Sequence, residues 1–185
     1  MTIYIHGFSG SGQGSKAKLF RKYFKSKDES FIAPSLSYVP ELAITTLEEL
    51  IESYNGNVKL IGSSLGGFYA LYLAKKYNLQ AVLLNPAIYP YRTLSKTSKS
   101  THNFYDNSSF EWNSLHITML KRYEIKNLNS ENFILLVQKG DELLDYKEAV
   151  EKLKYSKMIV DDGGSHIFDN IEKYFSEISS FLSKK

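Results

Sequence analysis

Short apolar runs recur along the chain, separated by stretches with helical periodicity. Each run is nearly continuous in apolar residues and does not alternate with polar ones, as in strands that are covered on both faces of a sheet. We therefore expect buried strands at six places: TIYIH (2–6), FIA (31–33), VKLIG (58–62), AVLLN (81–85), FILLV (133–137) and KMIVD (157–161).

Between these runs, apolar residues return every three or four positions, which is the spacing of one face of an α-helix. Strand and helix therefore alternate, and this order indicates parallel strands joined by right-handed crossovers. The predicted fold class is α/β, with a mostly parallel open sheet of about six strands and helices on both faces. Sites in such sheets lie at the carboxyl ends of the strands. The helical stretches are 15–26, 41–54, 66–77, 145–155 and 169–183, with a further helical piece around 114–123.

Segment 87–132 departs from this alternation, because it follows the fourth predicted strand and is rich in Ser, Thr, Asn and Tyr. The length of 185 residues fits one domain over 1–185 with this segment as a small insertion. The insertion either caps the strand ends or is a surface excursion. As a cap it would line an apolar acyl site with aromatic side chains; as an excursion it would only pack them on the core. The candidates for binding substrate are Tyr89, Tyr91 and Trp112, with Phe104, Tyr105 and Phe110 close by.

The composition is that of an ordinary globular protein, with 43% hydrophobic and 23% charged residues. The net charge is +3, but the lysines are dispersed, so we expect no nucleic-acid partner. The absence of cysteine excludes disulfides and a cysteine nucleophile, and four scattered histidines do not indicate a metal site. No apolar run approaches eighteen residues and no signal peptide precedes the first strand, so we expect no membrane span and a cytoplasmic location.

The sequence HGFSGSGQGSK (6–16), which follows the first predicted strand, is rich in glycine. It matches neither the phosphate-binding pattern G-x-x-x-x-G-K-[ST] nor the dinucleotide fingerprint G-x-G-x-x-G, because its glycines and lysine have the wrong spacing. A phosphate site is therefore not the preferred interpretation of this loop.

The third predicted strand carries a clearer motif, because VKLIGSSLGGFYALYLA places G-x-S-x-G between a strand and an amphipathic helix. Residues two before and two after such a serine crowd together and must be small. Ser64 has Gly62 and Gly66 at these positions, whereas Ser63 has Ile61 and Leu65. Ser64 is therefore the candidate nucleophile. The alternative is a tight turn whose serine only caps the following helix.

A serine nucleophile needs a base, and the base needs an orienting acid. His166 follows the last predicted strand and is the candidate base. Asp141 and Asp145 both follow the fifth strand, but Asp145 opens a helix with Glu148 three residues on, a capping pattern that explains it structurally. Asp141 is therefore preferred as the acid, since Asn85, at the end of the preceding strand, carries no charge.

The remaining histidines have structural or surface interpretations. His6 abuts the first strand before the glycine-rich loop, and His102 and His116 lie in the insertion. The glycine-rich loop itself is expected to closely approach the turn around Ser64, which is the nucleophile elbow of the G-x-S-x-G motif. Its Phe8 N–H, together with the Leu65 N–H at the start of a helix, would stabilise the oxyanion of a tetrahedral intermediate.

These motifs together resemble the α/β-hydrolase superfamily and, more narrowly, the small bacterial YqiA-type esterase family. The resemblance rests on YIHGFSGSGQGSKA, LIGSSLGGFYALYLA, LLNPAIYPY, GDELLDY and DGGSHIF, in that order. It implies an α/β-hydrolase fold and a serine esterase with Ser64, Asp141 and His166 as triad, acting on a small-molecule ester or an acyl-CoA thioester without a cofactor. A non-catalytic binding protein of this fold, a C–C bond hydrolase and a peptidase remain alternatives, since one fold serves several chemistries.

Overall fold

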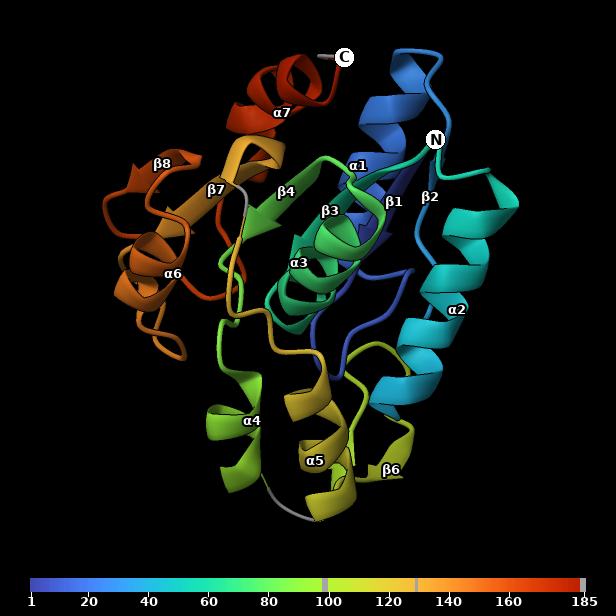
Figure 1. Cartoon of the computed structure of the whole chain (residues 1–185), viewed down its shortest axis with the longest axis vertical. Helices are drawn as coiled ribbons and strands as arrows, with labels where there is room; N and C mark the ends of the chain where they lie inside the picture. Colours follow the sequence, from blue (N-terminus) through green and yellow to red (C-terminus); the bar gives the residue numbers. More distant parts are fainter. Residues whose placement is uncertain (98–99, 129, 184–185) are drawn as a thin grey trace.

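The computed structural model describes residues 1–97, 100–128 and 130–183. Its central element is one sheet of six parallel strands in the order β2-β1-β3-β4-β7-β8. The predicted α/β class with an open parallel sheet is confirmed (Figure 1). The strands are β1 (Thr2–Ile5), β2 (Phe31–Ile32), β3 (Lys59–Ser63), β4 (Ala81–Leu84), β7 (Phe133–Gln138) and β8 (Lys157–Asp161).

Helices cover both faces of this sheet, as its continuous apolar strands require. Helices α2 (Pro40–Ser53), α3 (Leu65–Tyr77) and α6 (Tyr146–Lys152) pack on one face, and α1 (Ser15–Ser26) and α7 (Phe175–Leu182) pack on the other (Figure 1). Successive strand residues point to opposite faces. Ile3 and Ile5 therefore belong to the cluster under α2 and α3, whereas Tyr4 packs with α1 and α7.

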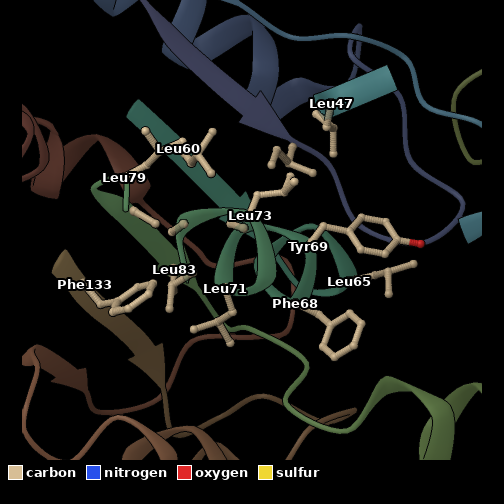
Figure 2. Packing of buried hydrophobic residues seen from close by; sticks show 14 of the residues in the cluster. Leu47, Leu60, Leu65, Phe68, Tyr69, Leu71, Leu73, Leu79, Leu83 and Phe133 are labelled. Atoms are coloured by element: carbon tan, nitrogen blue, oxygen red, sulfur yellow. The ribbon is translucent and has the colours of Figure 1, made fainter. Parts of the chain in front are cut away.

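Helix α3 is the most deeply buried helix of the sheet's first face, and its side chains radiate in several directions into the core (Figure 2). Leu73 packs toward the strands, while Phe68 and Tyr69 point away from Leu73 in two different directions, and all three side chains are buried. Each fully buried side chain of this size contributes about 1.5–3 kcal/mol by leaving water. The helix is thus held firmly, and so is the turn that precedes its first residue, Leu65.

The insertion forms its own small elements at one end of the sheet (Figure 1). Its hairpin is fixed to the loop after β1, because the Phe104 N–H donates to Ser9 O at 2.8 Å and the Asn103 amide donates to Gly10 O at 2.9 Å. Of these elements, only the helix around 114–123 matches a sequence prediction. The elements are α4 (Pro90–Thr93), η1 (Leu94–Lys96), β5 (Ser100–His102), β6 (Ser109–Glu111), α5 (Ser114–Arg122) and η2 (Ser130–Asn132).

The predicted C-terminal helix over 169–183 begins later than expected. Asn170 adopts a left-handed conformation with φ 54°, and a 3₁₀ turn, η3 (Ile171–Tyr174), precedes α7. Within the described residues, no helix has both the length and the apolar character needed to cross a membrane.

Candidate active site

Ser64 occupies the sharp turn between β3 and α3, with φ 54° and ψ −121°. A non-glycine residue rarely adopts a positive φ, and the surroundings must hold it there. Here the Ser64 N–H donates to Leu84 O at 3.1 Å, and the Ser64 carbonyl accepts from Gly67 N at 2.9 Å and Ala87 N at 3.0 Å. These bonds fix the turn to β4 and to the chain beyond it.

The two glycines beside Ser64 are required by close backbone contacts. A Cβ atom on Gly62 would lie 2.3 Å from Gly66 O, and one on Gly66 would lie 2.1 Å from Ile5 O. Both distances are far inside van der Waals contact, so the strand, the turn and the helix pack together only without side chains at these positions. Gly7 of the loop after β1 also comes close, since a Cβ atom on it would lie 3.0 Å from Ser64 Cβ.

We expect Gly66→Ala to destabilise the fold by more than about 4 kcal/mol, because the new methyl group meets backbone that has no room to move. Gly56→Ala is the matched control, since Gly56 has φ +69° but open space around it. That change costs only the left-handed strain of about 1–2 kcal/mol. Urea unfolding of both variants measures the difference, and equal losses would refute the steric explanation.

The structure brings Ser64, His166 and Asp141 together from three separate loops. His166 Nε2 lies 3.0 Å from Ser64 Oγ, and His166 Nδ1 lies 2.9 Å and 3.0 Å from the two carboxylate oxygens of Asp141. The Asp141 side chain is only 2% exposed. The three groups therefore form one continuous hydrogen-bonded chain that ends at the strained serine.

Asp141 is held in its charged form despite being buried. Burial acts to raise the pKa of this carboxyl, but hydrogen bonds from His166 and from the N–H groups of Leu144 and Leu143 outweigh it and lower the pKa below its ordinary value. Asp145 has a different place. Its carboxylate accepts from Lys147 N at 3.0 Å and caps α6, while Glu148 lies 3.7 Å from Arg92 and not back at the cap.

The loop that carries His166 is anchored by side chains that the sequence analysis did not assign. The Asn85 amide donates to the carbonyls of Ser165 and His166 at 2.9 and 3.3 Å. Gln138 Oε1 accepts from the Ser165 and Asp169 N–H groups. Asn85 and Gln138 are themselves joined, since the Gln138 N–H donates to Asn85 Oδ1 at 2.9 Å. Their positions at the ends of β4 and β7 were the available signal.

Phe8 and Leu65, the residues expected to supply oxyanion donors, both lie near Ser64: Leu65 follows it directly, and Phe8 follows Gly7, on which a Cβ would lie 3.0 Å from Ser64 Cβ. Phe8 belongs to a turn closed by the Gly10 N–H donating to Gly7 O at 3.1 Å, with Ser9 at φ 56°. Leu65 is the first residue of α3. Within the described part of the chain, neither N–H has a protein acceptor. Both donors are therefore available next to the serine.

The other histidines have structural roles or lie on the surface. His6 Nε2 accepts from the Leu36 N–H at 3.0 Å, so its Nδ1 carries the proton and donates to Gly7 O at 2.8 Å. Burial lowers the pKa of His6 and keeps it neutral. His116 accepts from the Asn113 N–H and caps α5, and His102 is exposed in β5. The described residues contain no cluster of three or more metal-ligating side chains.

Two cavities meet at Ser64, and both are also lined by His166, Phe8 and Phe104. We call the cavity that borders the insertion the insertion-side cavity, and the one that borders α1 the α1-side cavity. The insertion-side cavity has a volume of about 510 Å³, and the α1-side cavity has a similar volume. The first is walled mainly by apolar groups: Leu65, Ala87, Pro90, Leu94, Leu143 and Leu144. The second carries more polar groups: Tyr4, Ser11, Ser15, Lys16, Ser63, Asp169 and Glu172.

The aromatic residues predicted to bind substrate do not line these two cavities. Trp112 is 2% exposed, packs edge-on against Phe8 at 4.8 Å and donates its indole N–H to Leu94 O. Tyr91 donates to Glu124 at 2.9 Å, and the Arg92 guanidinium lies 4.0 Å from the Tyr89 ring centre. Of these three residues, Trp112 contacts Phe8 and Leu94, which do line the insertion-side cavity. Of the insertion's aromatic residues only Phe104, which is 83% exposed, faces both cavities.

The fold and the elbow define the chain as an α/β-hydrolase-fold protein, and comparison with solved structures confirms this. It aligns with Est1E from Butyrivibrio proteoclasticus in complex with ferulic acid (TM-score 0.73, 12% identity, 98% of this chain and 87% of the other). It also aligns with the α/β hydrolase domain-containing protein 10 from mouse (0.74, 17%, 98% and 88%) and with a monoacylglycerol lipase from Paleococcus ferrophilus (0.70, 16%, 98% and 93%).

The chain belongs to the Uncharacterised protein family (UPF0227), which it matches over residues 1–183. Among its relatives are the UPF0227 protein YcfP of Escherichia coli and the UPF0227 protein ECA1814 of Pectobacterium atrosepticum. Each is 23% identical over 186 residues that cover 98% of both chains. The α/β-hydrolase fold expected from the motifs is thus confirmed, and UPF0227 is the family to which the chain belongs.

Proposed function

We propose that this protein is a serine hydrolase that cleaves carboxylic esters or acyl thioesters through an acyl-enzyme on Ser64. The observation that carries the proposal is the hydrogen-bonded chain from Asp141 through His166 to Ser64 Oγ. The N–H groups of Phe8 and Leu65 near this serine have no acceptor among the described residues. The α/β-hydrolase fold, shared with the monoacylglycerol lipase and with Est1E, agrees with this activity.

Acylation begins when Ser64 Oγ attacks the carbonyl carbon of the substrate and its proton passes to His166 Nε2. The negative charge of Asp141 stabilises the imidazolium that forms. The N–H groups of Phe8 and Leu65 stabilise the oxyanion, and each such donor is worth about 3–4 kcal/mol in comparable enzymes. The tetrahedral intermediate then collapses, and the leaving alcohol or thiol takes the proton from His166.

Deacylation repeats these steps with water as the nucleophile. His166 removes a proton from the water, the new C–O bond forms, and Ser64 Oγ leaves with that proton. The products are the free acid and the regenerated enzyme. No step needs a metal or a cofactor.

The insertion-side cavity is the proposed site for the acyl group. It adjoins Ser64 and Leu65, its walls are mainly apolar, and its volume of about 510 Å³ lies within the range of small-molecule sites, about 300–1,000 Å³. An alkyl chain gains about 0.8 kcal/mol for each buried CH₂ group. We therefore expect kcat/KM to rise with acyl chain length until the cavity is filled. A series of p-nitrophenyl esters and acyl-CoAs of graded length tests this activity and separates ester from thioester preference.

Leu94→Trp is expected to shift the preference to shorter acyl chains, because Leu94 lines the insertion-side cavity and the indole takes up its volume. Activity on acetyl esters is expected to persist, while that on the longest accepted chain falls by about 10-fold or more. Leu115→Trp is the control, since Leu115 is exposed on α5 and does not line this cavity. An unchanged chain-length profile in Leu94→Trp would place the acyl group elsewhere.

A further inference from the structure

Lys16 extends from the first turn of α1 into the α1-side cavity. There it contacts a residue next to Ser64 and a residue next to His166. Its ammonium donates to Ser63 Oγ at 3.2 Å and to the carbonyl of Ile167. Ser63 immediately precedes the nucleophile Ser64, and Ile167 immediately follows His166. One cation thus connects the serine turn and the histidine loop, which are about a hundred residues apart in the sequence.

The position of Lys16 is energetically unfavourable for a charged lysine. A cation in the first turn of a helix opposes the helix dipole, and no carboxylate of the described residues forms an ion pair with its ammonium. Burial lowers the pKa of Lys16 to about 8, although the nearby charges of Asp169 and Asp141 act in the opposite direction. Neither helix stability nor an ion pair explains a lysine here, and its place beside both reacting groups indicates a role in the site.

The histidine loop shows what this lysine adds. Asn85 and Gln138 bind the backbone of Ser165 and Asp169, on the side of the loop that faces β4 and β7. The Ile167 carbonyl faces α1, and among described residues its side-chain donor is Lys16. Without the ammonium, the backbone directly after His166 loses its hydrogen bond to a side chain of α1.

We propose that Lys16 is a positioning residue, whose ammonium holds Ile167 against Ser63 and thereby keeps the His166 imidazole within hydrogen-bonding distance of Ser64 Oγ. This inference rests on the proposed hydrolase function. Lys16 is not assigned a contact with the substrate. It acts through the two residues that carry the reaction.

Replacing Lys16 with methionine tests this role, because the variant keeps most of the side-chain volume and removes the donor. We expect kcat to fall about 10²-fold, the cost of a misplacement of about 1 Å, with KM nearly unchanged. The loss is expected to be equal for a neutral ester and for a matched ester that carries a carboxylate on its leaving group. Lys22→Met, an exposed position on the same helix, is the control and should behave as wild type.

The pH dependence adds a readout that a purely structural role would not change. The wild-type rate is expected to decline above pH 8 as Lys16 loses its proton. Lys16→Arg should keep much of the activity and lack this decline, because a guanidinium stays charged. The other titratable groups that face the same cavity are Tyr4, His6, His166, Asp169 and Glu172, with Asp141 nearby. Since these groups are the same in the variant, loss of the decline assigns it to Lys16.

Stability is expected to follow the opposite trend over the same pH range. The folded protein holds the Lys16 proton more weakly than the unfolded chain, whose lysines titrate near pH 10.4. Lys16 therefore contributes a free energy of unfolding that rises between about pH 8 and pH 10. If the rate declines above pH 8 while the free energy of unfolding does not fall, the decline in rate is due to lost positioning of His166 and not to unfolding.

The outcomes are distinct. If wild-type protein neither hydrolyses esters nor reacts with a fluorophosphonate, the proposed function fails, and Lys16 is not at issue. If wild type reacts and folded Lys16→Met reacts at the same rate, the positioning role is refuted. A rise in KM confined to the carboxylate-bearing ester would also refute it, since that result assigns Lys16 to substrate recognition.

Discussion

Ser64→Ala is expected to abolish ester hydrolysis and covalent labelling by a fluorophosphonate probe. Removing the nucleophile of a serine hydrolase costs about 10⁶-fold in kcat. A fluorophosphonate reacts rapidly only with a serine whose proton is taken by a neighbouring base, and His166 Nε2 lies 3.0 Å from Ser64 Oγ. Labelling followed by peptide mass spectrometry should therefore find one modified residue, Ser64, in the wild-type protein.

Ser63→Ala is the matched control, because Ser63 differs from Ser64 by one position and ends β3 in regular strand geometry. This variant loses the hydrogen bond between Lys16 and Ser63 Oγ, so it is expected to react more slowly but still at Ser64. Acidification that protonates His166 should slow labelling of wild type, since an imidazolium accepts no proton. Label on Ser63 would overturn the elbow assignment, and a folded protein without label or turnover would favour the non-catalytic binding protein.

The parts of the site that depend on backbone geometry were predictable from the sequence. A Cβ atom on Gly62 or Gly66 would lie only 2.3 or 2.1 Å from a backbone oxygen, so the spacing of these two glycines around Ser64 identified the turn. The continuous apolar strands likewise predicted a sheet covered on both faces. These features follow from local sterics and burial, which a short stretch of sequence carries within itself.

The walls of the cavities were not predictable in the same way. Trp112 and Phe104 are both aromatic residues of the insertion, but Trp112 is buried behind Phe8 and Phe104 is exposed at the mouth of both cavities. Which of the two faces the site depends on how the hairpin is fixed to Ser9 and Gly10, a contact between distant segments.

The supports of His166 were missed for a related reason. Asn85 was noted only as a position without the charge that an acid would need, yet its amide holds the histidine loop through two carbonyls. Gln138 is the last residue of β7, and its position at the end of that strand was its only sequence signal. Polar side chains at the carboxyl ends of central parallel strands are the pattern to examine, because loops that follow neighbouring strands meet at that edge.

Asp141→Asn is expected to lower kcat by about 10⁴-fold, the loss measured for the equivalent change in a serine protease. The amide keeps the shape of the carboxylate but carries no charge for the imidazolium. It also offers His166 Nδ1 a donor where the carboxylate accepts, which favours the wrong tautomer. The Leu143 and Leu144 N–H groups still find the side-chain oxygen at 2.9 Å, so the loop is expected to remain folded.

Asp145→Asn is the control for that experiment. Asp145 caps α6 by accepting from Lys147 N, and asparagine is about as good a cap as aspartate. Its kcat should therefore equal that of wild type. Comparable losses in the two variants would remove the kinetic basis for choosing Asp141. A large loss in Asp141→Asn alone, with the unfolding midpoint in urea nearly unchanged, assigns to this buried carboxylate the task of orienting and charging the imidazole, because packing and capping are then shown to be intact.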